Sequence, residues 1–142
     1  MSGNRKFKKV ALDSNIFIYQ FEQNVKFTIF TNKIINRLDQ GEYQGITSII
    51  SVIEALSYPS PPKILDLIVE SFNSIPNLKI IDINWKISLL AAQIRREYGF
   101  RLPDAVQLAT AVNAKAQIFI TNDARLKSFK QLEVLKLSDL RD

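Results

Sequence analysis

Short runs of consecutive apolar residues alternate along this chain with longer segments in which apolar residues recur every three or four positions. The short runs predict buried strands, and the longer segments predict amphipathic helices. The predicted strands are 9–12, 44–47, 78–83, 117–121 and 134–137. The predicted helices are 14–21, 26–40, 49–56, 63–72, 85–98 and 103–112. This alternation predicts an α/β fold, a three-layer α/β/α sandwich with a largely parallel central sheet.

Residues that start or stop helices support several of these boundaries. Gly41 and Gly99 directly follow two of the predicted helices, where glycine commonly ends a helix. Pro103 lies where proline is tolerated at a helix start, and Ser48 is the predicted cap of the helix at 49–56. With 142 residues, 46% of them hydrophobic, the chain is predicted to form a single domain, 1–142.

Two residue types that serve many enzymes are missing. The chain has no cysteine and no histidine, which excludes disulfides, thiolate nucleophiles, imidazole bases and the usual zinc sites. Catalysis would therefore use carboxylates, lysine, tyrosine, hydroxyls or a metal held by oxygen atoms. Oxygen ligands favour hard cations such as Mg²⁺ or Mn²⁺. The formal charge of +5 favours a polyanionic partner without requiring one.

The N-terminal segment is basic but lacks an apolar stretch long enough for a signal peptide or a membrane span. We therefore expect a cytoplasmic protein without a membrane partner. Residues 1–8 are predicted to be flexible, and Arg5, Lys6, Lys8 and Lys9 form either a phosphate-binding arm or a soluble tail.

Four acids follow or open the predicted elements in a way that suggests a common site. Asp13 and Asp123 follow strands, Asp104 opens a helix, and Glu54 lies within an apolar helix. Taken singly, each aspartate can be a helix cap or turn residue, and Glu54 can lie on a solvent-facing strip. In an open α/β sheet, however, functional residues gather beyond the carboxyl ends of the strands. Four carboxylates brought together there would repel one another unless a divalent cation neutralised them.

The motifs around these acids resemble those of the PIN domain ribonucleases, in particular the VapC-like toxins of toxin–antitoxin pairs. The resemblance extends over nearly the whole chain. The matching motifs are LDSNI with Asp13 and Asn15, a serine six residues before a glutamate (Ser48 and Glu54), LPDAVQLATA with Asp104, and Thr121-Asn122-Asp123. Gln107 stands where some relatives of the wider nuclease superfamily carry a further acid, so a second metal site would be incomplete.

This resemblance implies an Mg²⁺- or Mn²⁺-dependent endoribonuclease that acts as the toxin of a pair, forms a homodimer and binds an antitoxin protein. It implies that the metal is held by Asp13, Glu54, Asp104 and Asp123. The residues expected to orient the carboxylates or the phosphate are Asn15, Ser48 and Thr121, although caps and turns explain them equally well. Basic residues near the motifs are candidate RNA contacts or a solvated surface: Arg95, Arg96, Arg101, Arg125 and Lys127.

Two other functions and one structural alternative remain open at this stage. A PIN-like domain can bind RNA or protein without cutting, but a pure binder has no use for four mutually repelling acids. A phosphotransferase with Asp13 as nucleophile usually has a second acid two residues on, where this chain has Asn15. The apolar face around Phe17, Phe21 and Phe27, with Phe30, suits either an antitoxin groove or the domain core.

Overall fold

The computed structural model describes residues 8–141, which form a five-stranded sheet in the order β3-β2-β1-β4-β5 with every neighbouring pair parallel. The strands are β1 (Lys8–Leu12), β2 (Tyr43–Ser48), β3 (Leu78–Ile81), β4 (Ile118–Thr121) and β5 (Glu133–Lys136). Each of them overlaps a predicted strand, and the parallel sheet is confirmed.

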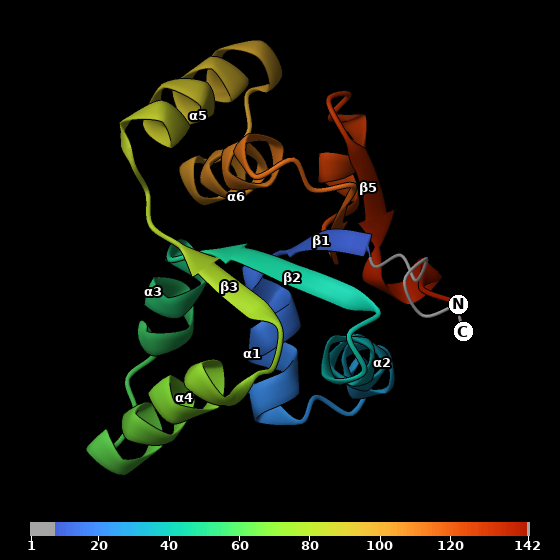
Figure 1. The fold of residues 1–142 in the computed structure, drawn as a ribbon. Helices are drawn as coiled ribbons and strands as arrows, with labels where there is room; N and C mark the ends of the chain where they lie inside the picture. Colours follow the sequence, from blue (N-terminus) through green and yellow to red (C-terminus); the bar gives the residue numbers. More distant parts are fainter. Residues whose placement is uncertain (1–7, 142) are drawn as a thin grey trace.

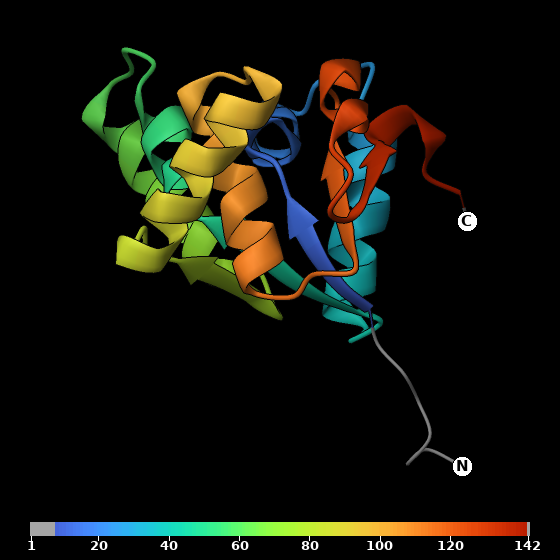
Figure 2. The ribbon, with the colours of Figure 1, turned by 90° about the horizontal axis from the view of Figure 1, so that it is seen from above.

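Helices cover both faces of the sheet (Figure 1). The helices are α1 (Ser14–Glu22), α2 (Thr28–Asp39), α3 (Ile50–Leu56), α4 (Pro62–Ser74), α5 (Trp85–Tyr98) and α6 (Leu102–Asn113), with short 3-10 turns η2 (Ala124–Ser128) and η3 (Leu137–Asp139). Helices α1 to α4 lie on one face, and α5 and α6 lie side by side on the other (Figures 1 and 2). The predicted three-layer sandwich is therefore confirmed.

The central strand β1 shows how the sequence pattern builds two cores. Val10 and Leu12 point into the core under α1 to α4, whereas Ala11 between them points into the core under α5 and α6. Because successive strand residues face opposite sides, a strand covered on both faces must be apolar throughout. Phe17 is fully buried in the first core, and Phe21 packs against it partly buried. Phe27 and Phe30 also pack against this core, which supports the core interpretation of the phenylalanine face.

Ser48 ends a strand and is not the residue that caps α3, so that prediction was wrong by one position. Its backbone pairs with Ile81 as the last residue of β2, and α3 begins at Ile50 after Ile49. The Ser48 hydroxyl nevertheless accepts a hydrogen bond from the Ile50 amide at 3.1 Å, as a capping serine does. The serine is thus held at the carboxyl end of the sheet.

Lys8 and Lys9 belong to β1, and the Lys9 ammonium donates to the Ala114 carbonyl at 3.1 Å. These two lysines are therefore part of the sheet, and the proposed arm falls on residues 1–7, outside the described residues. No helix within 8–141 has the length and apolarity needed to cross a bilayer.

Candidate functional site

Asp13 lies directly after β1 at the carboxyl edge of the sheet, where its carboxylate is almost completely buried. Its backbone amide donates to Ile120 O of β4 at 3.0 Å, and its side chain is the N-cap of α1. Oδ1 accepts from the Ser14 amide at 2.8 Å, and Oδ2 accepts from the Thr121 hydroxyl at 2.6 Å. The capping interpretation is therefore correct, and the same residue also stands where a site is expected.

Burial raises the pKa of the Asp13 carboxyl from 3.8 to about 6, although the hydrogen bonds from Thr121 and Ser14 oppose this increase. The negative charges of Asp104 and Glu54 raise this pKa further. Since charges act on a pKa only over short range, three of the four predicted acids share one electrostatic environment. Such an environment favours a cation beside Asp13.

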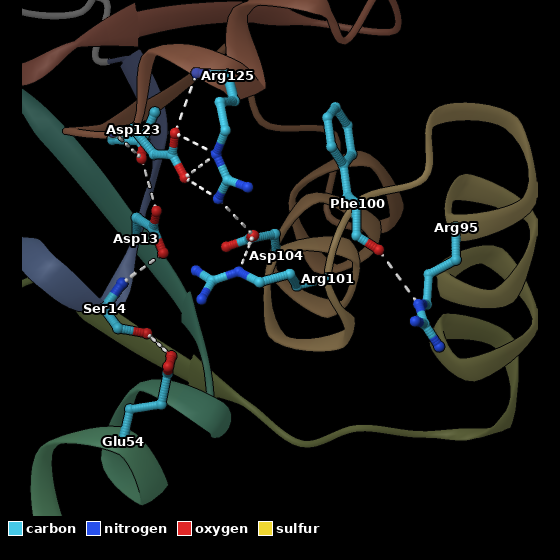
Figure 3. Close-up of polar contacts among 10 residues, drawn as sticks. Asp13, Ser14, Glu54, Arg95, Phe100, Arg101, Asp104, Asp123 and Arg125 are labelled. Carbon is cyan, nitrogen blue, oxygen red and sulfur yellow. Dashed lines mark hydrogen bonds and ion pairs between the residues drawn. The ribbon is translucent and has the colours of Figure 1, made fainter.

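Asp104 and Asp123 are connected by the guanidinium of Arg125 (Figure 3). Arg125 Nη2 lies 2.5 Å from Asp123 Oδ2 and 3.5 Å from Asp104 Oδ2, and Arg101 Nε lies 3.2 Å from the same Asp104 oxygen. The hydrogen bonds from Arg125 hold the pKa of Asp123 below its ordinary value. Asp104 is buried, while both arginines are exposed. Two exposed cations thus neutralise two acids of the site.

Glu54 reaches the site from α3, on the other side of Asp13 (Figure 3). Its Oε1 accepts a hydrogen bond from the hydroxyl of Ser14, the first residue of α1. Its side chain is half-buried, so Glu54 is not on a plain solvent-facing strip. A contact across 40 residues of sequence therefore fixes the fourth acid.

The three predicted orienting residues have different surroundings. Thr121 Oγ1 donates to Asp13 and accepts from the Asp123 amide at 3.0 Å, so it joins two of the acids. Asn15 Oδ1 is buried and has no hydrogen-bond partner among the described residues, so this oxygen, two residues after Asp13 in the sequence, is available as a ligand. The Ser48 hydroxyl binds the start of α3, while the Ser48 amide donates to Gln107.

The predicted RNA contacts separate into two groups. Arg101 and Arg125 contact the acids, as described above. Arg95 donates to the Phe100 carbonyl at 3.2 Å, away from the acids in Figure 3, and Lys127 pairs with Asp139 at 3.7 Å. Arg95 and Arg96 line a largely apolar pocket of about 510 Å³ beside α5 and α6. Their role in RNA binding stays a prediction, as does that of the whole basic set.

The donor set fits a hard divalent cation in its chemistry, although the side chains do not stand as a finished metal site. In the described part of the chain, no three acidic side chains are grouped closely enough to hold one ion. The Arg125 guanidinium lies between Asp104 and Asp123 instead. Buried Asp13, with its raised pKa, and the unpartnered oxygen of Asn15 are both groups that a cation would satisfy. Metal binding would require Arg125 to move.

Sequence reasoning did not foresee the contacts made by Ser14, Ser51 and Gln107 behind the acids. Gln107 Nε2 donates to Ser14 Oγ at 3.0 Å and to Ser51 Oγ at 2.7 Å. The sequence feature that indicates such a contact is Gln107 itself, a glutamine within an otherwise apolar and alanine-rich helix, because a buried polar side chain needs a hydrogen-bond partner.

Comparison with known proteins agrees with this architecture. The family model described as PIN domain matches residues 10–132. The fold is similar to that of VapBC2 from Rickettsia felis bound to a promoter DNA fragment, with 18% identity and a TM-score of 0.71 over 90% of this chain and 98% of that one. It is also similar to a toxin–antitoxin complex from Klebsiella pneumoniae, with 22% identity and a TM-score of 0.69 over 90% and 97% of the two chains. A third similar structure is FitAcB from Neisseria gonorrhoeae, with 18% identity and a TM-score of 0.66 over 92% and 99%.

No curated protein matches the chain significantly. The solved structures are too distant in sequence to show more than a shared fold. The family model, in contrast, covers most of the chain and all four acids. The chain therefore belongs to the PIN domain family.

Proposed function

We propose that this protein is an endoribonuclease that depends on Mg²⁺ or Mn²⁺. The observation that carries the proposal is that Asp104 and Glu54 lie close enough to the buried Asp13 carboxylate to raise its pKa, while Arg125 joins Asp104 to Asp123. These four acids would hold the ion. Once bound, it would lower the pKa of a coordinated water and offset charge on the scissile phosphate, which explains how a chain without histidine can hydrolyse RNA.

The protein's own residues then position the reactants. Thr121 and the Ser14 amide hold both oxygens of Asp13, so that carboxylate is oriented before any substrate arrives. Arg101 and Arg125 are exposed at the rim of the site and can exchange their carboxylate partners for substrate phosphates. Arg125 contacts Asp123 through both Nε and Nη2, and guanidinium groups bind phosphates in the same bidentate manner. Release of Arg125 from Asp104 would thus accompany both metal binding and RNA binding.

The proposal extends to a role as the toxin of a toxin–antitoxin pair. The described fold covers almost the full length of toxin–antitoxin chains from several bacteria, which supports a protein antitoxin as partner. We also propose a homodimer and a cytoplasmic location. Light scattering of the purified protein, alone and with the product of any adjacent reading frame, would test the dimer and the partner.

The test of the nuclease is cleavage of a panel of labelled structured and unstructured RNAs in Mn²⁺, in EDTA, and with an Asp104→Asn variant. We expect wild-type protein to cut in Mn²⁺ only, and the variant not to cut. Asp66→Asn removes an exposed acid on α4 and should leave cleavage unchanged. Cleavage that persists in EDTA, or in folded Asp104→Asn protein, would contradict the proposal. A protein that binds RNA but neither cuts it nor binds Mn²⁺ would favour a non-catalytic domain instead.

A further inference from the structure

A chain of buried polar side chains lies directly behind Glu54 and Asp13. It connects α6 to β2, α3 and α1, and its central member is Gln107, which is only 2% exposed. The other members are Ser14, Thr47, Ser48 and Ser51, which are also buried. Buried polar groups are costly unless each donor and acceptor is matched, so the direction of every hydrogen bond can be worked out.

The carbonyl of Leu12 fixes the first direction, because it can only accept. Thr47 Oγ1 donates its single proton to Leu12 O at 2.8 Å. Thr47 must therefore accept in its 2.6 Å contact with Ser51 Oγ, and Ser51 supplies the proton. Ser51 then has no proton left for Ser14 Oγ, which lies farther away at 3.4 Å. With its own proton used, Ser51 can only accept from Gln107.

The Ser48 amide fixes the orientation of the Gln107 side chain in the same way. That amide lies 3.3 Å from Gln107 Oε1 and can only donate, so the amide oxygen faces β2. The Gln107 nitrogen then points to the two serines and donates to Ser51 at 2.7 Å and to Ser14 at 3.0 Å. Both hydrogen atoms of the side-chain amide are thereby used.

Ser14 receives a hydrogen bond from Gln107, so its one proton is free to point the other way. That proton is donated to Glu54 Oε1 (Figure 3). We propose that Gln107 is a positioning residue for the metal site: it fixes the direction of the Ser14 hydroxyl, which in turn holds the Glu54 carboxylate toward Asp13. A carboxylate at this position of α6 would accept where Gln107 donates and would compete with Glu54 for the Ser14 proton.

This inference rests on the proposed function, since it assumes that Glu54 binds the cation. Partners that orient metal ligands typically change metal affinity by 10- to 100-fold when removed. Gln107→Met conserves the length of the side chain but removes both donors. We expect this variant to bind Mn²⁺ about 10-fold more weakly than wild type.

Isothermal titration calorimetry with Mn²⁺ on the full chain tests the inference as a double-mutant cycle. The proteins are wild type, Gln107→Met, Glu54→Gln and the double variant. If Gln107 acts through Glu54, the Gln107 substitution should have almost no further effect on Mn²⁺ affinity once Glu54 is replaced. A loss of the same size in both backgrounds would overturn the inference, because a general structural effect does not depend on Glu54.

Two further variants keep the test informative. Thr110→Val, one turn along α6, removes a buried hydroxyl that donates to Val106 O of the same helix, so the Mn²⁺ affinity of this variant should equal that of wild type. If Gln107→Met does not fold, Ser14→Ala breaks the same chain one step closer to Glu54 and should also weaken Mn²⁺ binding about 10-fold. If folded Gln107→Met or Ser14→Ala protein binds Mn²⁺ as tightly as wild type, the role of Gln107 is overturned, but the proposed nuclease function is not. A folded wild-type protein that binds no Mn²⁺ contradicts the proposed function together with it.

Discussion

Replacing Asp13 by asparagine should make the metal-free protein more stable at neutral pH while it destroys the proposed site. The carboxylate is 6% exposed, and its pKa is raised from 3.8 to about 6, chiefly by burial. Between these two values the folded protein binds a proton that the unfolded chain has lost, so the free energy of unfolding falls as the pH rises. Above about pH 6 the buried carboxylate is ionised, and its burial then lowers the free energy of unfolding by the full amount.

The size of this cost follows from the pKa difference. A change of one pKa unit corresponds to about 1.36 kcal/mol, so ionised Asp13 costs the fold about 3 kcal/mol. The asparagine side chain is uncharged but loses one of the two hydrogen bonds that Asp13 accepts, which costs about 1 kcal/mol. Asp13→Asn should therefore raise the free energy of unfolding by about 2 kcal/mol at pH 7, and this advantage should disappear near pH 4.

Urea denaturation of both proteins in EDTA at several values between pH 4 and pH 7 measures this difference. Groups that titrate equally in both proteins cancel when the two free energies are subtracted. Adding Mn²⁺ should stabilise wild type and leave the variant unchanged, because ligand binding stabilises only a protein that has the site. A variant no more stable than wild type at pH 7, or a difference that does not change with pH, would refute the reasoning.

Three further predictions concern other parts of the molecule. In metal-free protein, Arg125→Gln should raise the pKa of Asp123 toward its ordinary value, and an unchanged pKa in a carboxyl NMR titration would show that Arg125 does not hold this acid in solution. Gly45→Ala places a Cβ 2.8 Å from Leu38 Cδ2 and should lower the free energy of unfolding, measured by urea denaturation, by about 1–3 kcal/mol. An unchanged denaturation midpoint would mean that the Leu38 side chain moves aside without loss of stability. Asn84→Ala removes the side-chain cap of α5 and should cost about 1 kcal/mol in the same assay, and a cost near zero would contradict the capping role.

The elements and their order were predictable because local sequence patterns determine most of them. β1 and β4 are apolar at most positions since both faces of the sheet are covered, and Gly99 ends α5 with a φ of +72° that glycine adopts freely. Asp13 and Asp123 were predictable as neighbours because a parallel sheet places the carboxyl ends of its strands at one edge, and these two acids directly follow β1 and β4. Glu54 and Asp104 lie on helices, and the metal site that all four acids would form stays a prediction.

The individual contacts were not predictable, because they depend on how distant segments pack. Ser14 and Glu54 are 40 residues apart, and only the packing of α1 against α3 brings them together. Nearness in sequence does not bring these arginines together in space: Arg95 lies only a few residues before Arg101, but it belongs to α5, which ends at Gly99, and it lies away from the acids in Figure 3. The resemblance marks Gln107 only as a position without an acid, whereas the structure shows that its buried side-chain nitrogen donates to Ser14 and Ser51.

The most direct test of the central claim, that the acids at the carboxyl edge of the sheet hold a divalent cation, is anomalous X-ray diffraction from crystals grown with Mn²⁺. We expect a manganese peak bounded by carboxylate oxygens of Asp13, Glu54, Asp104 and Asp123, with the Arg125 guanidinium displaced from Asp104. A crystal that shows no manganese at this edge, with Arg125 still joining Asp104 to Asp123, would contradict the claim.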